Sequence, residues 1–393
     1  MSRRAIIAGA GVGGLAAAIA LLEAGFQVAI YEKADTLAEF GAGLQLTPNA
    51  TRILSRLGAL NRVLAFASKP HAVLVLRGSD DLELTRMPLD GAERRWGSPY
   101  LVIHRADLQR ALIEAVRDQP GVELSLDATV IDFADDGDRI SVGLTMGMTQ
   151  TRDQADLLIG ADGLRSRVRD QLGFGAQDRA EFAGRVAYRA IVEAGDAETR
   201  SPRNNIVLRL GADAHLVQYP LRRGSLNLVA TIKSASPTGG ADREWDFAAK
   251  PPILQCAFAD WSREVRSLTS AQLQWRAWPI YCRPPISSFS LGRVALVGDA
   301  AHPMVPFLAQ GAAQAIEDAG ALARVFAQIR DIPAAVSIYS RDRVARSARV
   351  QREALKLGRI YHLSGPPAFA RDVTMRLLGP RGLLGRYDWL YGA

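Results

Sequence analysis

The glycine-rich turn near the amino terminus constrains the fold more than any other part of the sequence. Residues 4–9 have the composition of a buried strand, and an alanine- and leucine-rich helix pattern follows the turn to about Gly25. Residues 28–33 form a second apolar strand. These segments make one strand-helix-strand unit, which predicts an α/β fold built on a parallel sheet.

The turn has the spacing of a phosphate-binding loop. Glycines in such a loop permit a tight turn, let backbone N–H groups approach a pyrophosphate and bring the helix close to the strand. Glu32 ends the second strand, where a carboxylate can bind both ribose hydroxyls of an adenosine that lacks a 2′-phosphate. NAD and FAD are therefore both candidate ligands. The glycines concerned are Gly9, Gly11, Gly13 and Gly14.

A second strand-turn-helix segment, residues 296–312, contains the same elements far from the first. An apolar strand leads into Gly298 and Asp299, a turn with two prolines follows, and Gln310 and Gly311 open an alanine-rich helix. A glycine turn before a helix start is typical of a phosphate or dinucleotide site. Because the chain already has such a site at its amino terminus, this pattern alone leaves open what the second segment holds.

Composition disfavours several other classes of function. The 393 residues, 48% hydrophobic and 23% charged, are typical of a soluble globular protein of two or three domains. The charge is +7, but basic and acidic residues are interleaved along the chain, so no nucleic-acid partner is expected. The two cysteines and five histidines lack metal-ligand spacing, so no metal is expected. Without a membrane-spanning run or signal peptide, we expect no integral membrane association and a cytoplasmic location.

Hydrophobic periodicity divides the chain into interleaved domains. Long alternating strands over about residues 181–278, with a helix near 243–266, predict a mainly antiparallel sheet. Residues 104–118 have the pattern of an amphipathic helix. We predict a discontinuous nucleotide-binding domain and a substrate-binding sheet domain, followed by a C-terminal helical segment. Their ranges are 1–70, 101–180 and 279–350 for the first, 71–100 and 181–278 for the second, and 351–393 for the third.

Three ordered motifs make the chain similar to a known family. Asp162 and Gly163 stand before Arg165 and Arg167, and Gly298-Asp299 stands before His302. With the first glycine turn and Arg105, these motifs resemble the group A flavoprotein monooxygenases, which are FAD-dependent aromatic hydroxylases with the p-hydroxybenzoate hydroxylase fold. The resemblance spans about residues 4–350. It implies a Rossmann-like, GR2-type FAD-binding domain, NADH or NADPH as co-substrate, and hydroxylation by O2 through a flavin C4a-hydroperoxide.

The resemblance also assigns residues to FAD. Glu32 and Lys33 meet the adenosine ribose, and Arg105 lies along the phosphate and ribityl region. Val130 touches the adenine through its backbone, Asp299 binds the ribityl chain, and Asp162 serves FAD and the pyridine nucleotide or is mainly structural. Gly311 and Ala312 place a helix N-terminus against the flavin, where partial positive charge stabilises the reduced anionic ring. The roles of Arg165 and Arg167 stay open between a nicotinamide phosphate and solvent, and His302 is expected to be structural.

A histidine and a tyrosine are candidates for the chemistry on the substrate. The segment His215-Leu-Val-Gln-Tyr219-Pro resembles the branch that contains 3-hydroxybenzoate 6-hydroxylase, salicylate hydroxylase and 6-hydroxynicotinate 3-monooxygenase. On a strand these two side chains share a face, so both are expected to point into one pocket. A histidine is a suitable base for a phenol. The alternative is a structural histidine-tyrosine pair.

Departures from the family pattern bear on the substrate. In the pyridine-hydroxylating relative, the resemblance places histidines at the positions of Thr47 and Phe307 in this chain. The difference favours a small benzenoid acid as the substrate, either salicylate-like or 3-hydroxybenzoate-like. Tyr188 and Arg189 are expected in the same cavity, with Arg189 or Arg209 as partners of a substrate carboxylate. Two alternatives remain: a flavin monooxygenase for hydroxypyridines, fused heterocycles or alkenes, and a non-catalytic flavin-binding protein. The aromatic tail, residues 381–393, has two possible positions. It either closes over the fold or docks on a second subunit of a homodimer, and docking is slightly favoured.

Overall fold

A six-stranded sheet carries the glycine turn. The computed structural model describes residues 3–37, 42–175, 177–193, 204–237, 247–249, 251–270 and 274–392. In the sheet, five strands are parallel and only β18 at the edge is antiparallel. Its strands are apolar and buried, as expected where helices cover a parallel sheet. In spatial order they are β18 (Ser290–Leu291), β19 (Val294–Leu296), β11 (Leu157–Gly160), β1 (Arg3–Ala8), β2 (Phe26–Tyr31) and β7 (Val122–Ser125).

Helices from distant parts of the chain pack on this sheet. Helix α1 (Val12–Glu23) lies against α10 (Gly311–Gln328) and α5 (Arg105–Arg117), and α11 (Ile332–Tyr361) contacts β18 and β19. The α1 sequence VGGLAAAIALLE is apolar on every side, which suits a helix that is enclosed by its neighbours. A meander beside it consists of β8 (Ala128–Asp135), β9 (Ile140–Met146) and β10 (Thr149–Ala155).

The second large sheet has eight strands and is antiparallel except where β13 pairs with β4. Its two faces pack differently. Helices α8 (Pro251–Ala257) and α9 (Arg263–Ser270) cover one face, and α12 (Gly365–Gly385) packs against β5. The strands in spatial order are β16 (Phe247–Ala248), β17 (Arg276–Cys282), β12 (Glu181–Val192), β15 (Leu226–Lys233), β14 (Ala214–Pro220), β13 (Ile206–Gly211), β4 (Ala72–Arg77) and β5 (Glu83–Pro88).

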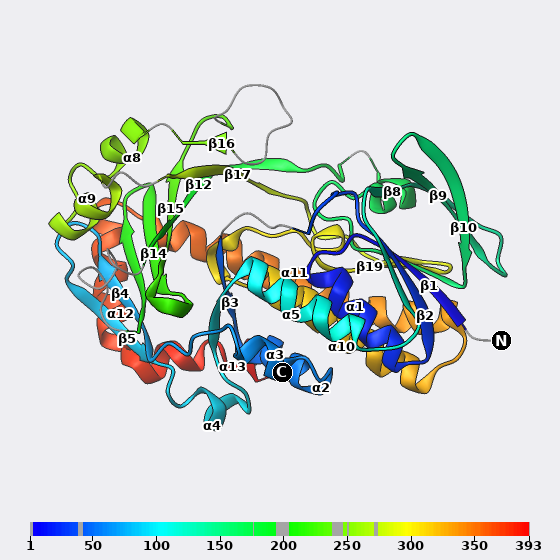
Figure 1. Cartoon of the computed structure of the whole chain (residues 1–393). Helices are drawn as coiled ribbons and strands as arrows, with labels where there is room; N and C mark the ends of the chain where they lie inside the picture. The colour runs from blue at the N-terminus through cyan, green and yellow to red at the C-terminus, as the bar shows by residue number, and fades with distance from the viewer. Residues whose placement is uncertain are drawn as a thin grey trace.

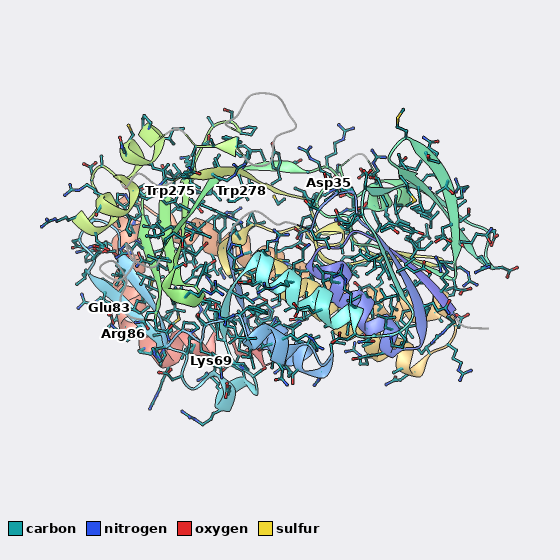
Figure 2. The ribbon with its side chains drawn as sticks, viewed as in Figure 1. Asp35, Lys69, Glu83, Arg86, Trp275 and Trp278 are labelled. Atoms are coloured by element: carbon teal, nitrogen blue, oxygen red, sulfur yellow. The ribbon has the colours of Figure 1, made fainter. Side chains whose placement is uncertain are left out.

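The two large sheets lie at opposite ends of the molecule, with α10 and α11 between them (Figure 1). A short ribbon of β3 (Gly43–Leu46) and β6 (Leu101–His104) lies between the sheets. Figure 2 marks Trp275 and Trp278 beside the eight-stranded sheet, at β17. The remaining elements are α2 (Pro48–Arg56), α3 (Leu60–Leu64), α4 (Ala92–Trp96), α6 (Arg167–Leu172), α13 (Asp388–Tyr391) and the 3-10 turns η1 (Arg222–Gly224), η2 (Gly298–Ala300) and η3 (Pro306–Leu308).

These elements confirm the predicted α/β fold with a mainly antiparallel second sheet and C-terminal helices. The helix expected at 104–118 is α5. The domain division stays a prediction, but two of its boundaries need correction. The boundary at 278/279 falls inside β17, which continues through Pro279, and that at 350/351 falls inside α11, where no helix breaker interrupts the pattern. Of the single helix expected near 243–266, residues 243–246 and 250 lie outside the described residues. The expectation of one helix is wrong for the rest, because residues 247–248 form strand β16 and the helical part is divided into α8 and α9.

The aromatic tail packs on its own chain, which is the alternative that the sequence analysis favoured less; docking on a second subunit stays a prediction. Leu390 and Tyr391 are buried, and the Tyr391 ring packs edge-on against Trp96 at 5.1 Å between centroids. Arg52 donates to the Tyr391 carbonyl oxygen at 3.1 Å, and Arg346 donates to the Leu390 carbonyl oxygen at 2.9 Å. The tail therefore belongs to the folded core.

Replacing Leu390 by alanine should lower the free energy of unfolding by about 2–4 kcal/mol, because the side chain is fully buried in an apolar cluster. Leu377, which lies on α12 and is 82% exposed, provides the matched control. Leu377→Ala should change the free energy of unfolding by less than about 0.5 kcal/mol. Urea unfolding of the two variants measures the difference. Equal effects would contradict the docked tail.

Candidate active site

The first glycine turn is shaped by contacts that exclude side chains. A Cβ atom on Gly14 would lie 2.0 Å from the Gly9 carbonyl oxygen, and one on Gly9 would lie 2.6 Å from the Ala161 oxygen. Gly9 also has a φ of +105°, which favours glycine. Gly11 is different, because no described atom lies within 4 Å of its would-be Cβ. The turn is thus tight on the protein side and open on the other.

Helix α1 begins at this open side. Gly11 is its N-cap, no side chain caps the helix, and the first turn holds no acidic residue. The N–H groups of the first turn and the positive end of the helix dipole are therefore left without a capping side chain or an acidic residue in that turn. This arrangement suits a phosphate group.

Glu32 is fixed beside the turn. Its carboxylate accepts from the Ala10 N–H at 2.7 Å and from the Ala34 N–H at 3.0 Å. The start of β8 is hydrogen-bonded to the backbone at Glu32, because the Ala128 N–H donates to the Glu32 carbonyl oxygen at 2.9 Å. Val130 follows in β8, where its side chain is buried in the core, and Lys33 is exposed. The residues expected around an adenosine are therefore neighbours.

The second strand-turn-helix segment lies directly against the first. A Cβ on Gly13 would be 3.4 Å from the Ala315 Cβ in α10 and 3.8 Å from the Gly298 Cα. Small residues on both sides permit this approach of α1 to α10. Two segments nearly three hundred residues apart in sequence therefore form one continuous site.

Asp299 and the start of α10 supply the polar groups of the second segment. The Asp299 side chain is exposed, although protein atoms crowd round it, and desolvation raises the pKa of its carboxyl while Arg105 and His302 oppose the rise. Gly311 is the first residue of the 18-residue helix α10, with Ala312 next, and no side chain caps this end. The positive end of the α10 dipole is therefore available to an anionic group.

A buried polar network holds this segment in place. The Asp318 carboxylate accepts from the Gly298 N–H at 2.8 Å, and it lies 2.7 Å from His302 Nε2 and 2.7 Å from Arg343 Nε. Burial raises the pKa of Asp318, but the charges of His302 and Arg343 outweigh it, so the pKa is lowered. His302 is thereby held in a buried hydrogen bond with Asp318.

In strand β14 of the eight-stranded sheet, side chains point alternately to the two faces, and this decides which residues lie together on one face. His215, Val217 and Tyr219 share one face, opposite Thr231, Val229 and Asn227 of β15 respectively. His215 and Val217 line a cavity of about 450 Å³ between this face, η3 and the C-terminal helices. Gln45, Tyr100 and Phe307 line it as well. The cavity wall is mainly aliphatic and aromatic.

His215 is held among other rings. Its Nδ1 lies 2.7 Å from Nε2 of His362, and its ring meets the Phe307 ring edge-on at 5.6 Å between centroids. Burial lowers the pKa of His215 well below its ordinary value, and the neighbouring charges of His362 and Arg185 act in the same direction. His215 is therefore a neutral imidazole near pH 7.

Comparison with known proteins shows which family of proteins has this fold and site. Residues 3–354 match the family described as FAD binding domain. The chain belongs to this family. A 3-hydroxybenzoate 6-hydroxylase from Polaromonas naphthalenivorans is 35% identical over 98% of this chain and 95% of its own length. A 3-amino-4-hydroxybenzoate 2-monooxygenase from Streptomyces platensis is also 35% identical, over 99% and 96%. The solved structure of Klebsiella pneumoniae HpxO with FAD and uric acid aligns with a TM-score of 0.87, at 28% identity, over 99% of this chain and 96% of that one.

Membership of the FAD-binding family confirms FAD as the cofactor and a flavoprotein monooxygenase as the type of enzyme. The residues present suit FAD. On its protein side the glycine turn has no space for an added Cβ, whereas at Gly11 it leaves space for a ligand. The N-termini of α1 and α10 offer N–H groups that no side chain caps. Glu32 would hold the adenosine ribose, and Asp299, Gly311 and Ala312 would hold the ribityl and flavin end. These individual assignments stay predictions.

Asp162 makes hydrogen bonds that support the local fold, and its role toward FAD stays a prediction. Its carboxylate accepts from the Ser166 hydroxyl at 2.5 Å and from the Arg167 N–H at 2.8 Å, so it helps to cap α6. Burial raises the pKa of Asp162, with these hydrogen bonds acting against the rise. Arg165 and Arg167 are exposed beside it.

Two residues expected in the substrate cavity lie on the wrong face of the sheet. Tyr188 lies opposite Ala230 on the neighbouring strand, and Ala230 lies opposite Leu216 on the next one, so the three share a face of the sheet. On this face Tyr188 packs with α8 and α9 in a separate apolar cluster. Arg209 pairs with Leu216 and binds Asp81 at 2.5 Å on that same face. The expectation for Tyr188 is wrong because side chains alternate along a strand, so residues 188 and 189 cannot share a face. That for Arg209 is wrong because its partner across the sheet, Leu216, also faces away from His215.

Arg189 and Tyr219 are on the face of His215, with other surroundings than expected. Arg189 pairs with Val229 and stacks over the Trp278 ring at 4.5 Å. Tyr219 is absent from the described residues that line the 450 Å³ cavity. It packs instead against β3, where a Cβ on Gly43 would lie 2.6 Å from the tyrosine ring. Burial raises the pKa of the Tyr219 hydroxyl above its ordinary range.

Residues that line the cavity, such as Tyr100 and Gln45, were missed by the sequence analysis, as was His362, which contacts the lining residue His215. Tyr100 donates to the Gln45 carboxamide oxygen at 2.5 Å at the cavity wall. His362 lies at the end of α11, in the segment GRIYHLSG, and contacts His215. No motif marks these residues, and only their order on the folded sheet and helices brings them together.

Glu32→Ala should weaken FAD binding by at least about tenfold, because the carboxylate orders the glycine turn and would bind the ribose. The exposed Glu23, at the end of α1, provides the control, and Glu23→Ala should leave the affinity unchanged. Flavin fluorescence titration of the apoprotein measures both dissociation constants. Equal affinities would remove Glu32 from the FAD site.

The His215–His362 pair should make the protein less stable in mild acid. Burial lowers the pKa of His362 to about 4 and that of His215 well below its ordinary value, so the folded state resists protonation while the unfolded chain titrates near 6.5. The free energy of unfolding should therefore fall between about pH 6.5 and 4, by roughly 1–3 kcal/mol from this pair. Urea unfolding across this range, compared with the double variant His215→Gln, His362→Gln, isolates the contribution. An identical slope in the variant would contradict it.

Proposed function

We propose that this chain hydroxylates a small phenolic aromatic acid, salicylate-like or 3-hydroxybenzoate-like, using FAD, NADH or NADPH, and O2. The observation that carries the proposal is a neutral, buried His215 on the wall of an apolar cavity beside Phe307. A ring is hydroxylated more readily when its phenol loses a proton, and a neutral imidazole is the group that accepts one.

The proposed roles follow from the placement of each group. When bound, FAD supplies electron transfer from NAD(P)H and activation of oxygen. The α1 N-terminus binds the pyrophosphate, and the α10 N-terminus stabilises negative charge at the flavin end. His215 accepts the phenol proton at a ring nitrogen. Phe307 and the other apolar residues of the cavity wall exclude water from the reacting groups.

A benzenoid ring fits this cavity better than a charged or strongly polar heterocycle. Phe307 presents an apolar ring at the cavity wall. Thr47 is fully buried, and its hydroxyl is bonded to Asn49 at 2.6 Å and to Gln310 at 2.9 Å. Neither residue offers a base or a charge to a pyridine nitrogen. The relatives at 35% identity act on hydroxybenzoates by their names, which supports the same class.

The substrate class is tested with the purified FAD-loaded protein. Oxidation of NADH and of NADPH is measured with a panel of hydroxybenzoates, hydroxypyridines and uric acid, and hydroxylated product is quantified against hydrogen peroxide. We expect product from at least one hydroxybenzoate. Product from only a pyridine or uric acid, or peroxide alone with every compound, would overturn the proposal.

His215→Gln should reduce hydroxylated product by about a hundredfold or more, because the phenol loses its proton acceptor. FAD content should stay unchanged, since His215 lies on the sheet and not among the glycine-turn residues. The exposed His71 is the matched control, and His71→Gln should keep full product formation. If the His215 variant loses FAD but its remaining FAD-loaded fraction hydroxylates normally, His215 is structural.

A further inference from the structure

A second buried histidine contacts the proposed base. His362 Nε2 lies 2.7 Å from His215 Nδ1, and His362 Nδ1 lies 2.6 Å from the Gly358 carbonyl oxygen. Both imidazoles are buried, with exposed fractions of 4% for His215 and 7% for His362. A line of hydrogen bonds thus runs from a backbone carbonyl through one ring to the other.

The direction of these hydrogen bonds follows from the carbonyl. A carbonyl oxygen only accepts, so the proton of neutral His362 is on Nδ1 and its Nε2 carries a lone pair. That lone pair can only accept, so the proton of neutral His215 is on Nδ1. The remaining ring nitrogen of His215, Nε2, is then unprotonated and can accept a proton.

The surroundings keep both rings neutral. The charged groups that influence the pair are Arg185, Asp213 and Arg371, and burial with Arg185 lowers the pKa of both histidines. Arg185 and Arg371 oppose a positive charge on His362, whereas Asp213 favours it weakly. The Phe307 and Tyr361 rings, which meet His215 edge-on at 5.6 Å, contribute no charge near neutral pH.

His362 is itself held rigidly at the end of α11. Arg371 of α12 donates to the carbonyl oxygens of Ile360 at 3.2 Å and Tyr361 at 2.9 Å. Phe307 packs over Gly358, where a Cβ would lie 2.4 Å from its ring. The last turn of α11, which includes the Gly358 carbonyl that orients His362, is therefore held by contacts with Arg371 and Phe307.

We propose that His362 is a positioning residue that keeps the His215 proton on Nδ1 and leaves Nε2 as the proton acceptor toward the substrate cavity. The pairing of a catalytic histidine with a fixed partner at its other nitrogen is a general way to select one tautomer. The proposal deepens the proposed function, since it rests on His215 as the base. It assigns a function to the carboxyl end of α11.

The tautomer is measured directly by ¹⁵N NMR of the FAD-loaded protein labelled at histidine, at pH 7.5 without substrate. The chain has five histidines, and His215→Gln identifies the His215 signals. We expect His215 Nδ1 to be protonated and Nε2 unprotonated. In His362→Leu the two tautomers should mix, whereas His362→Gln, whose carboxamide oxygen can replace the accepting Nε2, should restore the native pattern. A proton on Nε2 in the native protein, or an unchanged pattern in His362→Leu, would overturn the proposal.

Turnover separates this proposal from the proposed function. With the hydroxybenzoate that gives product, His362→Leu should lower kcat on the order of ten- to a hundredfold, and His362→Gln should recover most of it. Unaltered kcat in His362→Leu, despite mixed tautomers, would overturn the positioning role. If the native tautomer is as expected but His215→Gln hydroxylates normally, the base assignment fails and the hydrogen-bond assignment stands.

Discussion

The carboxylate of Asp318 is the contact on which the geometry of the site most depends. It joins the turn at Gly298 and His302 to helix α10, which carries Asp318, and to helix α11 through Arg343. Arg343 also binds Glu317 at 2.6 Å, and Asn49 of α2 donates to Glu317 at 2.6 Å. A buried charge that lost one of these partners would cost several kcal/mol. The position of Asp299 and of the α10 N-terminus is therefore fixed before any ligand arrives.

Close packing of small residues extends this constraint to the amino-terminal turn. A Cβ on Gly13 would already be in van der Waals contact with Ala315 and Gly298, so α1 and α10 begin side by side. In the account proposed here, the two uncapped helix N-termini would serve the two ends of one long cofactor. The substrate face follows from the same helices, because η3 leads from the Gly298 turn to α10 and carries Phe307 to His215.

The sequence was informative where chemistry requires particular residues at short spacing. The glycine turn, Glu32 and the α5 helix could be predicted because steric and periodic rules act locally. Alternation also placed His215 and Tyr219 on one face, although only His215 reaches the cavity. The same alternation, applied to residues 188 and 189, would have excluded Tyr188 from that face. His362, Tyr100 and the Asp318 network depend on contacts between distant elements, which no local pattern encodes.

A crystal structure of the protein with FAD and a bound hydroxybenzoate tests the central claim most directly. The account predicts one FAD that extends from Glu32 to the α10 N-terminus, with the substrate hydroxyl within about 3.2 Å of His215 Nε2. A flavin ring located away from Gly311, or a substrate hydroxyl that contacts no nitrogen of His215, would contradict it.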